Sequence, residues 1–566
     1  MSIGDLDALN ARRLRSAERR HRWYLFGSGL PALLLVLLTF VLPIGWLFWL
    51  SLFDANGQLT VENYTRLLEP IYVLTFVQTF KISIIVTIAC VLIGYPYAYF
   101  MVKGARWLAN LAMGLLLVSL WTSLLVRTYA WLIILQRRGI ANDLLMSLGL
   151  TDTPLALVHN LTGTVIGMVH IMLPFMILPL YAAMKSIDPI YNQAAATFGA
   201  SPSRAFRDVF LPLSLPGLAA GATLVFVITL GFYVTPALLG GGKVQMISMR
   251  IESDVSMYAN WGQRLRWAWC CCWPPCSCCS SSRRAPASAG AASEIMIGFK
   301  QTLMAALRGC WLYVLVLATM LFLVLPTLIV IPMSLSDARY LSFPPKSLSI
   351  EPFFSYFASL EWRSATVVSL ITATLTMLLA TTLGTAAAYS LHVTQSRLTG
   401  VLRGLLMAPM IVPTIFIAIG LFFVYARMDM NNTIPGLVLA HTLLALPYVV
   451  INVSAGLRSY DMTLEQAACI LGATRLRAFF DVTLPQIRFS VIAAAMFAFA
   501  ISLDEAVISL FISGGDSSTL TKRMFSSLRS EIDPLIAVVA TLMTLLSISM
   551  LCISIMAQRK ARRAAA

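Results

Sequence analysis

Charged residues are scarce in this chain. Only 12% of its 566 residues are Asp, Glu, Lys or Arg, whereas a soluble globular protein usually has about a quarter. Apolar residues make up 58% of the sequence, and the mean hydropathy is +0.80. This composition excludes a soluble enzyme with one large packed core. At about 20 apolar residues per spanning helix, it predicts an all-α, polytopic membrane helix bundle.

Acidic residues are scarcer than basic ones. The chain has 25 Asp and Glu against 41 Lys and Arg, which gives a formal net charge of +16. The basic residues concentrate in the tails, with six arginines from Arg12 to Arg22 and four basic residues from Arg559 to Arg563. Basic residues beside apolar spans mark the cytoplasmic side of a membrane protein. We therefore predict that residues 1–24 form a basic cytoplasmic tail, that both termini are cytoplasmic, and that the positive charge serves the membrane rather than nucleic acid.

Cysteine is rare outside one short stretch. Six of the ten cysteines lie between Cys270 and Cys279, without the paired C-x2-C spacing of zinc sites. Pro274 and Pro275 also oppose a helix at the place where a membrane span is expected. Because a TGC cysteine codon read one base earlier in a GC-rich run becomes CTG, a leucine codon, a shifted reading frame is the favoured explanation of residues 264–295. A metal site and a genuine irregular linker are the alternatives.

One strong internal repeat organises the chain. Residues 192–212 read NQAAATFGASPSRAFRDVFLP, and residues 465–485 read EQAACILGATRLRAFFDVTLP. At a fixed offset of 273 residues, 12 of these 21 positions are identical, which shared hydrophobicity cannot produce. The sequence therefore predicts two homologous membrane halves, residues 25–263 and 296–566. Each half is expected to have about six spans, although the first half shows five clear apolar runs before the cysteine-rich joint.

Each repeated segment is predicted to form a short helix, a turn and a second helix at the membrane surface. Glycine permits the sharp turn, and Ser201 and Thr474 suit the start of the second helix. Retention of Gly, Arg, Asp and Pro in both copies favours a function over an ordinary duplicated loop. The candidate residues are Gln193, Ala194, Ala195, Gly199, Arg204, Asp208 and Pro212 in the first copy, and Glu465, Gln466, Ala467, Ala468, Gly472, Arg477, Asp481 and Pro485 in the second.

This repeated pattern resembles the EAA loop of permease subunits of ATP-binding-cassette importers. Gln193 and Gln466 stand where that family usually has Glu. The resemblance implies two tandem type I importer permease domains in a bacterial inner membrane. It also implies a coupling helix in each half that docks into a dimer of cytoplasmic ATPase subunits, and a periplasmic substrate-binding protein as a further partner.

The chain has no G-x-x-x-x-G-K-[ST] phosphate loop, so it cannot bind and hydrolyse ATP in the usual way. We accordingly expect no catalytic residue, no metal ligand and no cofactor bound by this chain, and we expect ATP to be used by the partner subunits. The protein is predicted to be a transporter component rather than an enzyme.

Three longer strings resemble the spermidine/putrescine importers. VRTYAWLIILQRRGIANDLL from Val126 and GFYVTPALLGGGKVQMIS from Gly231 are similar to the first permease subunit of such systems. SLDEAVISLFISGGDSSTLTKRMFSSLRSEIDP from Ser502 is similar to the second. The resemblance implies ATP-driven import of a small organic cation, with a polyamine favoured. An importer of an amino-acid-like compound, a metal ion or an anion, and an ATP-independent secondary transporter, are the alternatives.

Two adjacent acids, Asp504 and Glu505, lie in an apolar run. An unpaired acid in a membrane is costly, so these two are functional candidates. At the repeat offset they correspond to a stretch with aromatic residues, and rings beside acids suit a polyamine through cation–π contact. The predicted pathway residues are Asp504, Glu505, Phe232, Tyr233, Trp121 and Tyr129. The alternative is that one acid pairs structurally with Arg127 or Lys81.

Overall fold

The computed structural model describes most of the chain. The described residues are 27–53, 58–60, 62–257, 298–336, 343–345, 347–394, 397–530 and 533–565. The backbone of these residues is almost entirely helical. They also contain two isolated β-bridges, Phe53–Leu59 and Ser336–Leu348. The basic tail 1–24 and the joint 264–295 lie outside the described residues. The frameshift, metal-site and sixth-span hypotheses concern that joint, so they also fall outside the part of the chain that the structure describes.

Eight described helices are long and apolar enough to cross a membrane. They are Gly27–Ser51, Pro70–Lys103, Leu161–Lys185, Pro202–Leu230, Trp311–Met333, Leu360–Val393, Ile434–Arg458 and Arg475–Asp504. Two further helix pairs are sharply bent: Arg106–Trp121 with Leu124–Ser147 at 100°, and Leu398–Ile411 with Thr414–Arg427 at 97°. Leu535–Met550 is a shorter apolar helix. The prediction of an all-α, polytopic membrane protein is confirmed.

The helices repeat in the same order along the chain. The first series is η1 (Leu37–Val41), α2 (Leu42–Ser51), α3 (Glu62–Thr65), η2 (Arg66–Leu68), α4 (Pro70–Lys103), α5 (Arg106–Trp121), α6 (Leu124–Leu135), α7 (Ile140–Ser147), α8 (Leu161–Lys185), α9 (Pro189–Thr197), α10 (Pro202–Ala205), η3 (Phe206–Phe210), α11 (Leu211–Leu230), α12 (Val234–Leu239) and α13 (Ile247–Met257). The second is α15 (Gly298–Met333), α16 (Glu351–Ala358), α17 (Leu360–Val393), α18 (Arg397–Ile411), α19 (Thr414–Arg427), α20 (Ile434–Arg458), α21 (Thr463–Ile470), α22 (Arg475–Ala478), η5 (Phe479–Thr483), α23 (Leu484–Asp504), α24 (Val507–Ile512), η6 (Gly515–Ser517), α25 (Leu520–Ser530) and α26 (Leu535–Ala565). The elements from α4 to α13 correspond one to one with the elements from α17 to α25. The exceptions are α7 and η6, which have no counterpart in the other series.

The same local signals begin and end equivalent spans. At the start of α8, the Asn160 side chain accepts a hydrogen bond from a backbone amide in the first turn, and Thr433 does the same at the start of α20. These caps satisfy an amide that has no partner within the helix. Lys185 and Arg458 lie in the last turns of the two helices, where a positive charge interacts favourably with the helix dipole.

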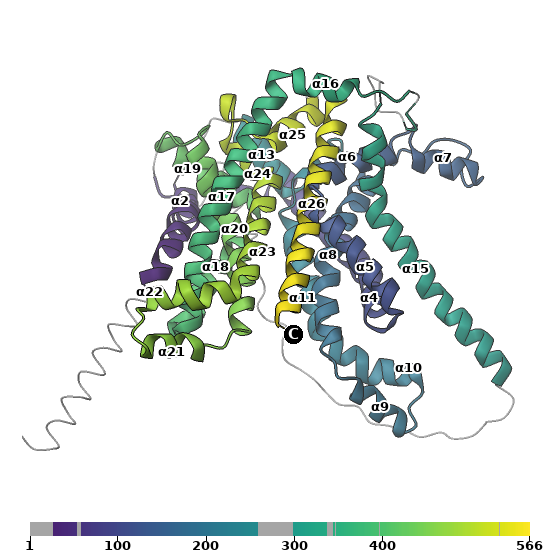
Figure 1. Cartoon of the computed structure of the whole chain (residues 1–566). Helices are drawn as coiled ribbons and strands as arrows, with labels where there is room; N and C mark the ends of the chain where they lie inside the picture. The colour runs from purple at the N-terminus through teal and green to yellow at the C-terminus, as the bar shows by residue number, and fades with distance from the viewer. Residues whose placement is uncertain are drawn as a thin grey trace, which may run out of the picture.

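The first span of each half packs against the other half. The span Gly27–Ser51 lies against α19 and α20, and α15 lies against α4, α5 and α6 (Figure 1). Ala32, Val36 and Phe40 are buried in a cluster of second-half residues, while Met320 and Leu323 of α15 are buried among first-half residues. Each half therefore completes its packing with a helix from the other.

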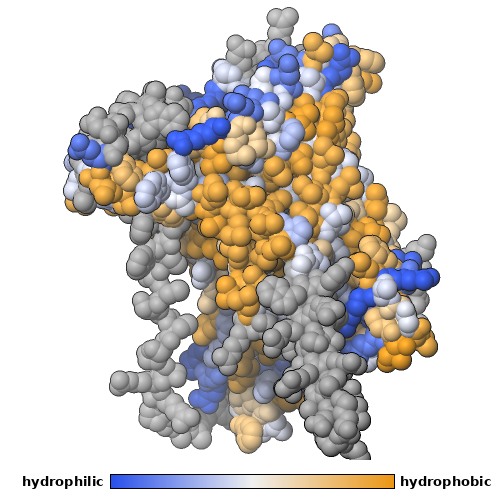
Figure 2. All heavy atoms as spheres, turned by 90° about the vertical axis from the view of Figure 1, so that its left-hand side faces the viewer, coloured by the Kyte–Doolittle hydropathy of each residue, from blue (hydrophilic) through white to orange (hydrophobic). Residues whose placement is uncertain are grey.

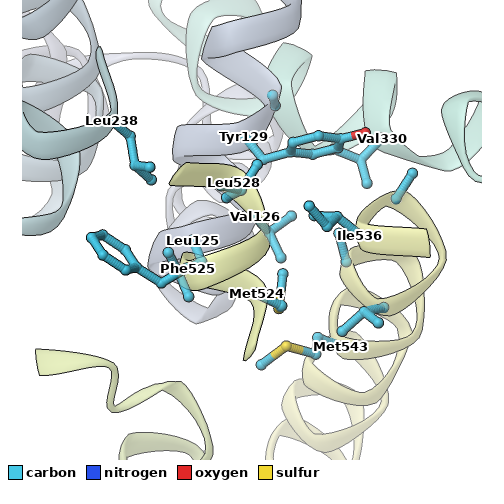
Figure 3. Close-up of a cluster of buried hydrophobic side chains, with 14 of the residues drawn as sticks. Leu125, Val126, Tyr129, Leu238, Val330, Met524, Phe525, Leu528, Ile536 and Met543 are labelled. Atoms are coloured by element: carbon cyan, nitrogen blue, oxygen red, sulfur yellow. The ribbon is translucent and has the colours of Figure 1, made fainter. Parts of the chain in front are cut away.

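A buried apolar cluster joins the two halves. Its labelled members come from α6, α12 and α15 and from α25 and α26: Leu125, Val126, Tyr129, Leu238, Val330, Met524, Phe525, Leu528, Ile536 and Met543 (Figure 3). Lipid tails are as apolar as these side chains, so close van der Waals packing stabilises this interface more than removal from water does. The cluster holds α6 and α25 in place beside the candidate site.

The outer surface of the bundle suits lipid. Large apolar side chains such as Leu74, Ile88 and Leu92 project from α4 and are more than half exposed. A water-soluble monomer rarely shows such large apolar patches. Figure 2 shows hydrophobic residues over the middle of one side, with hydrophilic residues gathered toward its ends. This distribution matches a helix bundle that is surrounded by a bilayer.

Candidate functional site

A cavity of about 260 Å³ lies between the two halves. Four interruptions of helices meet at its wall: the ends of α11 and α23, and the bends between α5 and α6 and between α18 and α19. Irregular backbone at membrane depth is tolerated where it is buried in protein or lines a cavity. We call this cavity the inner cavity. Because these four interruptions converge on it, it is the candidate site.

Four of the predicted pathway residues line the inner cavity. Phe232 and Tyr233 follow α11, and Asp504 and Glu505 lie at the equivalent end of α23. The repeat therefore brings the aromatic pair and the acidic pair to one space, as the shared offset suggested.

Trp121 and Tyr129 are placed differently from the prediction. The ring of Trp121 packs against Phe497 of α23, with 4.9 Å between ring centroids. Tyr129 is fully buried in the apolar cluster that joins the halves. Neither residue is on the wall of the inner cavity. Trp121 is half-buried at the end of α5, and Tyr129 is buried because the bend after Trp121 turns α6 into the interface between the halves.

Asp504 is held at the start of α6. The Ser123 hydroxyl donates a hydrogen bond to Oδ1 at 2.5 Å, and the backbone N–H of Leu124 donates to both carboxylate oxygens at 3.0 and 3.1 Å. A carboxylate there is stabilised by the free amides and the positive end of the helix dipole. Arg127, one turn further along α6 and only 4% exposed, attracts the same carboxylate. The surroundings of Asp504 thus fit the alternative interpretation, in which one of the two acids has a structural role near Arg127.

Glu505 is less engaged than Asp504. Among the described residues its carboxylate accepts one hydrogen bond, from the backbone N–H of Ile508 to Oε1 at 2.9 Å. A carboxylate can accept about four, so Glu505 keeps more capacity for a ligand than Asp504 does. Sequence reasoning gave Asp504 a slight preference over Glu505. The partners that distinguish the two acids come from distant segments, so the sequence did not reveal them.

A larger outer cavity of about 590 Å³ adjoins the inner one and shares Tyr233 with it. Glu252 of α13 and Arg529 of α25 form an ion pair on its wall, with 3.4 Å between Oε1 and Nη1. Tyr233 packs against Phe525, with 5.7 Å between ring centroids. Burial lowers the pKa of Lys522, which also lines this cavity. Tyr233 therefore lies between the two cavities, and residues of both halves line the outer one.

The two repeated segments lie at the same end of the bundle, which we call the loop end, on opposite sides of it in Figure 1; α13 and α25 lie toward the opposite end. In both copies the helix–turn–helix prediction is confirmed. Gly199 and Gly472 make the turns with φ of +77° and +96°, a region that glycine adopts without strain. Ser201 and Thr474 accept hydrogen bonds from the backbone amide three residues later, at 3.4 and 3.3 Å.

Most of the predicted loop residues are accessible. Those exposed are Gln193, Ala194, Gly199, Arg204, Asp208, Pro212, Gln466, Ala467, Gly472, Arg477, Asp481 and Pro485, while Ala195 and Ala468 are half-buried. The repeated Arg and Asp face each other in both copies, at 4.0 Å in the first and 3.2 Å in the second. The loops therefore present similar surfaces away from the bundle.

Glu465 is the exception, because it is fully buried. Its Oε1 accepts a hydrogen bond from the Tyr389 hydroxyl at 2.5 Å and forms an ion pair with Nη1 of Arg475 at 3.2 Å. Its Oε2 accepts a hydrogen bond from the Thr483 hydroxyl at 2.5 Å. Sequence reasoning included Glu465 in the loop but missed this network, since Tyr389 lies 76 residues away. The available signal was the tyrosine that ends both GYPYAY and GTAAAY, at Tyr99 and Tyr389.

The first loop is fixed by aromatic packing instead. Asn192 stands at the position equivalent to Glu465, and Phe210 at that of Thr483. The ring of Tyr99 contacts Phe206 and Phe210 edge-on, with 5.4 and 5.3 Å between centroids. The Lys103 ammonium lies 5.8 Å from the centre of the Phe210 ring. In the second loop the ring of Tyr389 contacts Phe479, the counterpart of Phe206, with 4.8 Å between centroids. Both loops are thus attached to the spans by ring contacts, and the second adds the Glu465 network.

Comparison with known proteins agrees with this architecture. The family described as "Binding-protein-dependent transport system inner membrane component" matches residues 91–292 and 380–563, one match in each half. The chain is 36% identical over 202 residues to the spermidine/putrescine transport system permease protein PotB of Escherichia coli strain K12, covering 36% of this chain and 74% of that protein. It is 35% identical over 239 residues to PotB of Haemophilus influenzae, covering 42% and 82%. It is also 35% identical over 144 residues to the putrescine transport system permease protein PotI of E. coli, covering 24% and 51%. With both halves matched over most of their length, the chain belongs to the family of inner-membrane components of binding-protein-dependent transport systems.

Proposed function

We propose that this chain supplies both permease halves of an ATP-binding-cassette importer for polyamines such as spermidine or putrescine. The observation that carries the proposal is the inner cavity, where interrupted helices bring carboxylates and aromatic rings together. The similarity to PotB, a spermidine/putrescine transport system permease, and to PotI, a putrescine transport system permease, supports the same substrate class.

The chemistry of the inner cavity suits an ammonium group. Asp504 already accepts hydrogen bonds from Ser123 and Leu124, so we assign substrate contact to Glu505. A charge-assisted hydrogen bond from an ammonium to its carboxylate is stronger than a neutral one. The faces of Phe232 and Tyr233 would add cation–π attraction along the methylene chain.

The loop end suits docking of ATPase subunits. Phe198 is 91% exposed and Leu471 is 89% exposed, and the two stand at equivalent positions of the repeat. Exposed apolar side chains rimmed by polar residues are typical of protein interfaces. Two similar surfaces suit a dimer of cytoplasmic ATPases, which would supply the hydrolysis for which this sequence has no phosphate loop. A substrate-binding protein would then deliver polyamine at the opposite end.

The test is uptake by proteoliposomes that contain the full chain, with its ATPase and binding-protein partners added. We expect uptake of labelled spermidine or putrescine that requires ATP and all partners. Competition with amino acids, divalent metal ions and organic anions would define the substrate class. Uptake that proceeds without ATP, or that excludes polyamines, would contradict the proposal.

The role of Glu505 is tested in the same assay with Glu505→Gln. We expect polyamine uptake at low concentration to fall by about tenfold or more, the effect of losing one hydrogen bond to a charged group, while the variant still assembles with its partners. Asp516→Asn is the matched control, because Asp516 is exposed and outside both cavities. Equal uptake by the Glu505 variant and the wild type would remove Glu505 from the pathway.

A further inference from the structure

The proposal concerns Glu465, a fully buried acid on a helix at the surface of the loop end. Its neighbours in sequence, Leu464 and Gln466, are exposed. A residue that docked onto an ATPase would have to point outward with them. Glu465 points inward instead, so its contribution comes through the bundle and not through the docking surface.

The carboxylate of Glu465 connects four elements. It belongs to α21, and its partners Tyr389, Arg475 and Thr483 belong to α17, α22 and η5. Burying a carboxylate is costly unless it is paired and hydrogen-bonded, and these three partners satisfy both of its oxygens. Removing the hydrogen bonds of this side chain would therefore loosen the attachment of both loop helices to the span at once.

No equivalent carboxylate exists in the first half. Asn192, Pro202 and Phe210 stand at the positions of Glu465, Arg475 and Thr483. Tyr99, the counterpart of Tyr389, contacts Phe206 and Phe210 of the described loop with its ring. Tyr389 makes the same kind of ring contact with Phe479 of the second loop, and the Glu465 network adds directional hydrogen bonds and an ion pair to it. The two attachments therefore differ in stiffness.

We propose that Glu465 is a positioning residue that locks the second loop rigidly to α17, so that displacement of this loop by the ATPase moves the span. This inference rests on the proposed function. It makes the second loop the stiff connection through which ATP hydrolysis is coupled to transport, and the first loop the compliant one. Glu465 touches neither substrate nor nucleotide, and acts through Tyr389, Arg475 and Thr483.

The readout is the number of substrate molecules imported per ATP hydrolysed by the complete transporter in proteoliposomes. We expect Glu465→Ala to lower this ratio by roughly five- to tenfold, a size typical of coupling between sites, while the KM for ATP stays unchanged. Glu465→Gln should keep most of the ratio. Its carbonyl oxygen can still accept from Tyr389, and its amide can donate to Thr483.

The two tyrosines provide a matched pair. Tyr389→Phe removes the hydroxyl that holds Glu465 and should lower the ratio by about threefold, at the low end of the net contribution of one intramolecular hydrogen bond. Tyr99→Phe keeps the ring that contacts the first loop and should leave the ratio unchanged. If Glu465→Ala fails to fold, this pair decides alone.

The possible outcomes are distinct. Equal ratios for the two tyrosine variants, or a normal ratio in folded Glu465→Ala, would overturn the inference while leaving the proposed function intact. Absence of ATP-dependent uptake by the wild type would instead reject the proposed function itself. A loss of uptake that parallels a loss of ATPase binding would assign Glu465 to docking, which also contradicts the inference.

Discussion

At the end of α11 the first half has Gly231, and at the equivalent end of α23 the second half has Asp504. A Cβ atom at Gly231 would lie 2.1 Å from the Cβ of Pro413, so the backbone there is pressed against the bend of the second half. Asp504 instead uses its carboxylate to cap the start of α6 at the bend of the first half. Each half therefore braces the other half's bent span, one by close packing and one by hydrogen bonds.

The loops show the same divergence on a shared backbone. Both turn at a glycine, begin the second helix with a hydroxyl cap and contact the span through aromatic rings, and the second adds the Glu465 network. Backbone geometry depends on a few local signals, which both copies retain. Contacts between elements depend on pairs of side chains, which can be exchanged for another pair of equal strength. The halves have thus kept one scaffold and acquired separate roles.

The largest expected effect comes from removing the Asp504 carboxylate, the charged group in the comparison between Gly231 and Asp504. Asp504→Ala should lower the free energy of unfolding by about 3–5 kcal/mol, because the Ser123 hydroxyl and the Leu124 amide would each lose a hydrogen bond to a charged group. Thermal unfolding of the full chain in detergent would measure this loss. Asp516→Ala, at an exposed acid of the same half, should change stability by less than about 0.5 kcal/mol. Similar losses in both variants would mean that Asp504 does not brace the bend.

Filling the close contact should have a smaller effect. Gly231→Ala is expected to destabilise the chain by about 1–3 kcal/mol, as overpacking of a tight site usually does, since the added methyl would overlap Pro413. Gly114 of α5 has no heavy atom within 4 Å of a built Cβ. Gly114→Ala should therefore stabilise by roughly 0.5–1 kcal/mol through helix propensity. The same unfolding experiment checks both signs, and a neutral Gly231→Ala would show that the bend can shift freely.

The smallest effect should be the same in both halves. Ser201→Ala and Thr474→Ala each remove a helix cap worth about 1 kcal/mol, and the two hydrogen bonds differ by only 0.1 Å, at 3.4 and 3.3 Å. Hydrogen–deuterium exchange of the amides in α10 and α22 would report the local opening. Unequal changes in exchange between α10 and α22 would show that the contribution of the cap depends on how the loop is attached to its span. Such a result would sharpen the difference between the halves.

Several features of the site followed from sequence. The acids and aromatic residues of the inner cavity were found because an acid in an apolar run stands out and because the repeat offset aligned them. Trp121 and Tyr129 were assigned to the pathway for their residue type alone, and that signal is shared with ordinary packing. The bend between α5 and α6 directs both into the protein, and no local pattern indicated its 100° angle.

Apolar run lengths and one repeated motif were sufficient to establish a membrane protein of two tandem halves, with a helix–turn–helix loop in each. These properties depend on local quantities: transfer to lipid, helix caps and glycine turns. The exchange of first spans, the separate surroundings of Asp504 and Glu505, and the burial of Glu465 emerge from the assembled fold. They depend on which distant segments become neighbours, and the energy of a buried carboxylate is set by those neighbours more than by its own position in the chain.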